Sequence, residues 1–138
     1  MEISAKVKNA GADHVVAVRT GDDTRLLSIP ARNAGPGSGV NGGEFLMLAL
    51  ATCYCNDLYR EADRLGITLH AVEVEASAHF PGVGLAASDI RYRAKVSSPA
   101  EPAAIDDLLR RTDAVAEIHN TLRAGSPVVL VTASAHAP

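Results

Sequence analysis

The sequence has few aromatic side chains, few charges and almost no cysteine. Phe, Tyr and Trp make up 4% of the 138 residues, and Trp is absent. The core must therefore be built from Ala, Val, Leu and Ile. With 47% hydrophobic and 21% charged residues, the composition is that of a globular protein. The formal net charge is −3 and no run of Lys or Arg is present, so we expect no nucleic-acid partner.

Long hydrophobic runs are also missing. The longest, residues 45–51, is far shorter than the ~20 residues that a membrane-spanning helix needs. The first ten residues, MEISAKVKNA, have neither the apolar stretch nor the cleavage pattern of a signal peptide. Two cysteines without a secretory signal predict free thiols in a reducing compartment. We therefore expect a cytoplasmic protein that does not bind a membrane.

The five histidines form no metal-binding pattern. His70 and His79 are nine residues apart, and neither H-x-H nor H-x-x-H occurs. The sequence therefore predicts no metal ion, and we expect no cofactor.

The first third of the chain has the alternation of β-strands. In residues 2–9, Ile3, Ala5 and Val7 alternate with polar side chains, the pattern of a half-buried strand. Residues 14–20 and 25–30 are predicted as two more strands, joined by the turn GDD, in an antiparallel meander. The Gly-rich segment 31–43 is predicted to be a surface loop, either a plain connector or part of a site.

The rest of the chain combines two helical and three extended segments. Residues 44–65 are predicted as a helix that Gly66 ends, with a first half that is apolar on every face and buried in a core or a subunit interface. Two strands follow, 67–80 and 88–98, then a helix in 98–125 with Ser98 and Glu101 at capping-box spacing, and a strand at 127–136. The order β-β-β-α-β-β-α-β predicts a single α+β domain over 1–138 with an antiparallel sheet.

The two cysteines lie on different faces of the first predicted helix. At about 100° per residue, Cys55 falls on the apolar stripe that includes Leu58 and Ala62, which predicts a buried packing residue. Cys53 falls on the line Leu50, Asp57, Arg60, where apolar side chains give way to charged ones. A thiol at such a boundary is either a reactive nucleophile or an inert residue, and the pattern leaves both interpretations open.

The segments NGGEFLMLALATC and LRRTDAVAEIHNTLRAGSPVVLV, together with the order of elements, resemble the osmotically inducible protein C / organic hydroperoxide resistance (OsmC/Ohr) family. The first segment is similar to the family's helix start through Asn41, Glu44 and Leu46, and its LATC is similar to the stretch that ends in the family's cysteine. The resemblance implies an OsmC-like fold with a long central helix, in an intertwined homodimer.

The resemblance also implies a chemistry, the thiol-dependent reduction of organic hydroperoxides in oxidative-stress defence. Cys53 matches the peroxide-attacking cysteine, whereas the position of the resolving cysteine aligns with Ala116. An external thiol reductant would then have to regenerate Cys53. The family's catalytic Glu falls on Gly43, one residue before Glu44, which is either its substitute or a first-turn acid that favours the helix dipole. The family's Arg falls near Asp13 and His14, where no Arg stands.

His119 lies three residues after the lost resolving position. We interpret it as a proton donor, as a group that lowers the pKa of Cys53, or as a helix-surface histidine. The leading hypothesis is a one-cysteine peroxidase that uses Cys53, Glu44 and His119, with pocket walls from Phe45, Met47 and Leu48. The alternative hypothesis is a non-catalytic OsmC-like protein that binds a small apolar or reactive molecule in a dimer-interface pocket.

Overall fold

A computed structural model of the chain describes residues 1–131. The chain divides into two compact units, Met1–Leu46 and Met47–Pro138, and each is described by itself. The helix that crosses the boundary contributes its first residues to the first unit and the rest to the second. Within the described residues, no helix is long and apolar enough to cross a membrane. The expected single domain over 1–138 stays a prediction.

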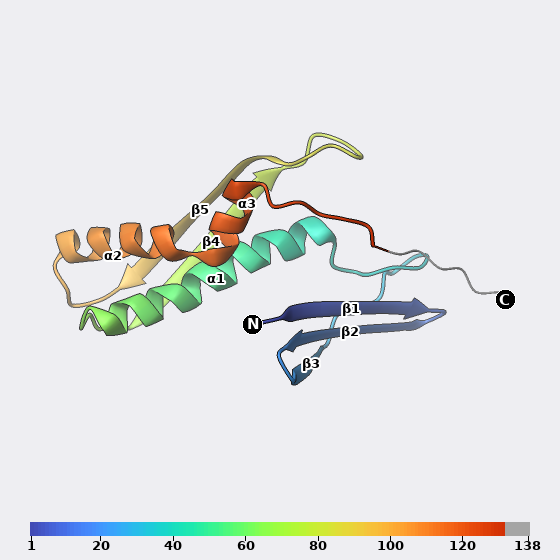
Figure 1. The fold of residues 1–138 in the computed structure, drawn as a ribbon, viewed down its shortest axis with the longest axis horizontal. Helices are drawn as coiled ribbons and strands as arrows, with labels where there is room; N and C mark the ends of the chain where they lie inside the picture. The colour runs from blue at the N-terminus through green and yellow to red at the C-terminus, as the bar shows by residue number, and fades with distance from the viewer. Residues whose placement is uncertain (132–138) are drawn as a thin grey trace. The chain divides into compact units, whose positions relative to one another are not determined.

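The first unit contains a three-stranded antiparallel meander in the order β1-β2-β3 (Figure 1). Its strands are β1 (Ile3–Ala10), β2 (Asp13–Thr20) and β3 (Asp23–Leu27), which confirms the three predicted strands. The β1–β2 turn needs Gly11, whose φ of 59° is costly for other residues. The predicted half-burial of β1 is wrong for the single chain, because Ile3 and Val7 remain 67% and 62% exposed.

Helix α1 (Gly42–Arg64) begins with a reciprocal cap. The Glu44 N–H donates to Asn41 Oδ1 at 2.8 Å, and the Asn41 N–H donates to Glu44 Oε1 at 3.0 Å. This is a capping box with Asn41 at the N-cap. At the other end Gly66 adopts a φ of 69°, and the Ile67 N–H donates to the Ala62 carbonyl, as predicted for a C′ glycine.

The second unit packs α1 against the hairpin of β4 (Ala71–His79) and β5 (Ser88–Ser97). The alternate residues of both strands point to the helices, as the period-2 pattern predicted. The core between them is made of Tyr54, Leu58, Ala62, Leu108 and Ala116, with partly buried hairpin side chains packed against it: Val72, Val74, Tyr92, Ala94 and Val96. The first half of α1 is not buried all round in the single chain, since Leu48 is 57% exposed.

The predicted second helix is two helices, α2 (Pro102–Val115) and α3 (Glu117–Ala124). Ala116 breaks them apart with an extended backbone (φ −73°, ψ 106°), and its side chain is fully buried. The predicted capping box at Ser98 is wrong. Pro102 at the first helical position holds Glu101 in an extended conformation, so the helix begins there. Ser98 instead donates its hydroxyl to the Thr68 carbonyl at 2.6 Å.

The predicted strand at 127–136 falls partly outside the described residues. Residues 127–131 belong to no strand, and the remainder, 132–136, lies outside the described range. The α+β class with antiparallel pairing is confirmed, in the order β-β-β-α-β-β-α-α. The described strands form two sheets, β1–β3 and β4–β5, where the sequence predicted one.

Candidate functional site

Cys53 lies beside two carboxylates that come from different helices. Its Sγ is 3.6 Å from Asp57 Oδ2, one turn further along α1, and 3.9 Å from Glu117 Oε2, the first residue of α3. Asp57 is 5% exposed, whereas the Glu117 side chain is 69% exposed. The thiol therefore has one buried and one solvent-facing acidic neighbour.

Arg60 connects the two carboxylates. Its Nη1 is 2.9 Å from Asp57 Oδ1 and 3.9 Å from Glu117 Oε1, and its Nε donates to Glu61 Oε1 at 3.3 Å. Arg64 pairs with the other Glu61 oxygen at 2.8 Å. Asp57 and Glu61 are buried acids, which are rare in proteins unless they are paired. Arg60 thus compensates the charge around Cys53.

The start of α3 faces the sulfur with a backbone donor. The N-cap position holds Ala116, which has no side chain that can accept a hydrogen bond. The backbone N–H of Ile118, the second residue of α3, lowers the pKa of the Cys53 thiol. Free N–H groups at a helix start stabilise anions, a thiolate included. Burial nevertheless raises the pKa of Cys53. Asp57 and Glu117 raise it further, and the Ile118 N–H opposes them.

Burial also raises the pKa of Asp57, with Glu117 acting in the same direction. The nearby Arg60 guanidinium opposes this shift. Cys53 and Asp57 therefore lie together with their pKa values both raised, mainly by burial.

Cys55 is half-buried and does not belong to the described core, so the prediction that it is a buried packing residue is wrong for the single chain. The buried face of α1 is centred on Tyr54, Leu58 and Ala62, and Cys53 is the cysteine that packs against it. Within the described residues both cysteines are free thiols.

His119 is 3% exposed, so the interpretation as a helix-surface histidine is wrong. Its ring packs edge-on against Tyr92, with centroids 4.4 Å apart, and at a tilt against Tyr54. Within residues 1–131 neither ring nitrogen has a hydrogen-bond partner. Burial lowers the pKa of His119, and Arg123 lowers it further, which favours the neutral imidazole. Its predicted role in proton transfer stays a prediction.

Glu44 belongs to the first unit, where its carboxylate closes the capping box of α1. This contact agrees with the interpretation of Glu44 as a first-turn acid. Its predicted role in catalysis is a separate question and stays a prediction.

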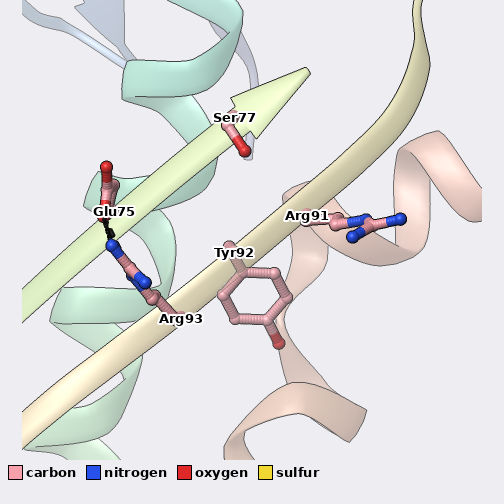
Figure 2. A pocket seen from close by; sticks show the side chains of 5 residues that line it. All are labelled: Glu75, Ser77, Arg91, Tyr92 and Arg93. Atoms are coloured by element: carbon pink, nitrogen blue, oxygen red, sulfur yellow. Dashed lines mark hydrogen bonds and ion pairs between the residues drawn. The ribbon is translucent and has the colours of Figure 1, made fainter. Parts of the chain in front are cut away.

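The second unit has one cavity lined by residues of α1 and α3, the helices that carry the Cys53 cluster, and another at the β4–β5 hairpin. One, of about 230 Å³, is lined by His119 together with Leu50, Ile90, Tyr92, Leu122 and Arg123. Its α1 wall is Leu50, one turn before Cys53, whereas the sequence predicted Phe45, Met47 and Leu48. The other is a groove of about 370 Å³ at the hairpin (Figure 2). There Glu75 and Arg93 pair across the strands, and Arg91 and Ser77 lie further along.

The cluster at Cys53 also has the donor set of a metal site. The sulfur and one carboxylate oxygen each from Asp57 and Glu117 lie within 4.8 Å of one another. Thiolate and carboxylate ligands suit zinc and similar cations. The Arg60 guanidinium already pairs with both carboxylates, at 2.9 Å from Asp57 and 3.9 Å from Glu117.

Sequence reasoning singled out Cys53 and placed Asp57 and Arg60 on its line, but it missed Glu117. Asp57 and Arg60 were visible as the next residues on the same helical face, at spacings of four and seven. Glu117 carries no local signal, because its nearness to Cys53 depends on where α3 packs. The alignment of Ala116 with the resolving position pointed to this neighbourhood.

The fold and the cluster define an α+β protein in which a long helix presents a thiol to the start of a second helix. The chain belongs to the OsmC-like protein family, whose family model matches residues 35–131. This confirms the resemblance found in the sequence.

Solved structures support the same fold. An OsmC-like protein from Mycoplasma pneumoniae matches with a TM-score of 0.62 and 18% identity, over 88% of this chain and 86% of that chain. An organic hydroperoxide resistance protein OsmC from Legionella pneumophila matches with a TM-score of 0.59 and 17% identity, over 89% and 90%. An organic hydroperoxide resistance protein from Elizabethkingia anophelis matches with a TM-score of 0.62 and 15% identity, over 89% of each chain. No curated protein matches.

Proposed function

We propose that this protein reduces organic hydroperoxides with the thiol of Cys53, as part of the defence against oxidative stress. The observation that carries the proposal is the position of the Cys53 sulfur, which lies within 3.9 Å of two carboxylates, one of them at the start of α3, where the N-cap residue offers no side-chain acceptor. Family membership supports it, as do structural neighbours named organic hydroperoxide resistance proteins.

The reaction uses one cysteine and an external reductant. The Cys53 sulfur attacks the terminal peroxide oxygen, the O–O bond breaks, and the products are a sulfenic acid and an alcohol. The only other cysteine, Cys55, is two residues away on the same helix, where the side chains diverge. A thiol from outside the protein therefore forms the mixed disulfide, and a second thiol releases Cys53. Both come from the reducing cytoplasm in which we place the protein.

The protein acts as a homodimer in this proposal. Large apolar side chains stay exposed in each unit of the single chain, among them Ile3 and Val7 in the first and Leu48 and Tyr59 in the second. Burial of such side chains against a second copy of the chain would remove their apolar surface from water. Sedimentation of a well-folded monomer at micromolar concentration would contradict this part of the proposal.

The second candidate function is the binding of a small apolar molecule without turnover. The cavity lined by Leu50, Ile90 and Leu122 favours it, as does the raised pKa of the Cys53 thiol, since a protonated thiol is a poor nucleophile. In this case Cys53 is a packing residue beside the ligand.

Sulfenic acid trapping separates the two functions. Reduced protein is treated with one equivalent of cumene hydroperoxide and a dimedone probe, and the adduct is located by mass spectrometry. We expect an adduct on Cys53 in the wild type and in Cys55→Ser, and none on this helix in Cys53→Ser. Equal labelling of the wild type and Cys53→Ser would end the peroxidase proposal and favour binding. In the same assay, Glu44→Gln and His119→Gln test the roles predicted for those residues.

A further inference from the structure

We propose that Asp57 and Glu117 act as a carboxyl pair that carries the proton of the reaction at Cys53, and that Arg60 holds this pair in position. The inference rests on the proposed peroxide reduction and adds to it the groups that move the proton. The sequence pattern placed Asp57 and Arg60 on the same helical line as Cys53 but gave them no role in the reaction, and it gave no sign of Glu117. The three residues are brought together by the packing of α1 against the start of α3.

The geometry gives the thiol proton two acceptors. Asp57 Oδ2 at 3.6 Å and Glu117 Oε2 at 3.9 Å are both within hydrogen-bond reach of Sγ, from different helices. The two carboxylates share the guanidinium of Arg60, with contacts of 2.9 and 3.9 Å. Burial and the neighbouring Glu117 raise the pKa of Asp57, so this carboxyl group takes up a proton more readily than an exposed acid does.

The surroundings make this pair the local route for protons. Asp57 is 95% removed from solvent contact, so on its side the thiol faces a carboxylate where water would otherwise lie. The remaining charged groups nearby are committed elsewhere. Glu61 pairs with Arg60 and Arg64, and Arg123 on α3 pairs with Asp113. His119, also on α3, packs between two tyrosines.

The step balances without any further reagent. The Cys53 thiol gives its proton to the carboxyl pair while the sulfur attacks the terminal oxygen of the peroxide. The O–O bond breaks, the sulfur is oxidised by two electrons to the sulfenic acid, and the departing alkoxide takes the proton back from the pair. The pair ends the step as it began, and the alcohol leaves. Proton transfer of this kind contributes roughly 10²–10⁴-fold to a rate.

A purely electrostatic role for the two carboxylates predicts the opposite effect. Asp57 and Glu117 raise the pKa of the Cys53 thiol, so without them more thiolate exists at neutral pH. If repulsion were their whole effect, neutral amides would speed up every reaction of Cys53. If they transfer the proton, amides slow the reaction with peroxide, because the leaving alkoxide must be protonated.

Two electrophiles on the same variants distinguish these roles. We would measure sulfenic acid formation with cumene hydroperoxide and alkylation with iodoacetamide, whose leaving iodide needs no proton. For Glu117→Gln and Asp57→Asn at pH 7 we expect peroxide rates at least ~10-fold below wild type. We expect alkylation rates equal to wild type or faster. Asp63→Asn, an exposed acid on the same helix, is the control and keeps both rates.

Arg60 is tested by its pH profile. Arg60 opposes the rise in the pKa of Asp57, so Arg60→Gln moves the acid limb of the peroxide reaction to higher pH, and Arg60→Lys restores it in part. If Arg60→Gln lowers the rate at every pH but leaves the acid limb of the pH–rate profile at the same pH, the positioning role is contradicted. A purely structural defect would give that result.

Failure of the inference is distinguishable from failure of the proposed function. Wild-type protein that forms no sulfenic acid overturns the function. Wild-type protein that reacts, together with Glu117→Gln that reacts with peroxide as fast or faster, overturns the carboxyl pair alone. Glu117 decides this even if Asp57→Asn does not fold, since its exposed side chain tolerates the amide.

Discussion

The starts of α1 and α3 each carry a glutamate in the first turn and use it differently. At α1, the side chains of Glu44 and Asn41 each accept the other residue's backbone N–H, so these two donors are not available to another group. At α3, Ala116 offers no side-chain acceptor, the Ile118 N–H lowers the pKa of the Cys53 thiol, and Glu117 lies 3.9 Å from the sulfur. Backbone donors are available for chemistry only at the helix start that lacks a cap.

Removing the cap at α1 is the strongest test of this comparison. Asn41→Ala should cost about 1 kcal/mol of unfolding free energy, since the Glu44 N–H loses its acceptor. Glu44→Ala should cost less once Asn41 has been replaced, because the two bonds are reciprocal. Urea unfolding followed by circular dichroism measures both. Asn56→Ala, exposed in the middle of α1, is the control and should be neutral or slightly stabilising. If Glu44→Ala costs the same unfolding free energy in the wild type as in the Asn41→Ala variant, the two hydrogen bonds of the capping box are independent.

Adding a cap at α3 makes the second helix start resemble the first. In Ala116→Ser the hydroxyl competes with the Cys53 sulfur for the Ile118 N–H, so the pKa of the thiol rises further. We expect iodoacetamide alkylation of Cys53 at pH 7 to slow by about two- to tenfold, which corresponds to at most one pKa unit. Ala114→Ser, two residues earlier and exposed, should leave the rate unchanged. Equal rates for the two serine variants would show that the N–H contact does not affect the thiol.

The same contrast explains what could be predicted of the fold. The strands, α1 and the stop at Gly66 follow from alternation, helical spacing and a left-handed glycine, all of which are local signals. The break at Ala116 had no such signal, because neither Gly nor Pro marks it and the helical pattern runs through it. The burial of Ala116 in the core accompanies the break, and packing partners of this kind are not encoded in neighbouring residues.

The site divides in the same way. The helical wheel placed Cys53, Asp57 and Arg60 on one line, and the structure brings them together. It also assigned Cys55 to the core, which was wrong because the core face of α1 is centred on Tyr54. Glu117 reaches Cys53 across 64 positions of sequence, and the burial of His119 depends on Tyr54 and Tyr92, from α1 and β5. Such long-range contacts are beyond a single sequence.

The smallest predicted effect concerns His119, the third residue of α3. Burial and Arg123 lower its pKa in the folded protein, so the unfolded chain binds a proton at His119 more readily. Stability is therefore complete above the ordinary histidine pKa of ~6.5 and is lost as the pH falls from there toward the lowered folded value. We expect the urea midpoint to drop less between pH 7.5 and 5.5 in His119→Phe than in wild type. His70→Gln, an exposed histidine, should match wild type. An unchanged pH dependence in His119→Phe would contradict the assignment of this loss of stability to His119, because burial and Arg123 would then have no effect on its protonation.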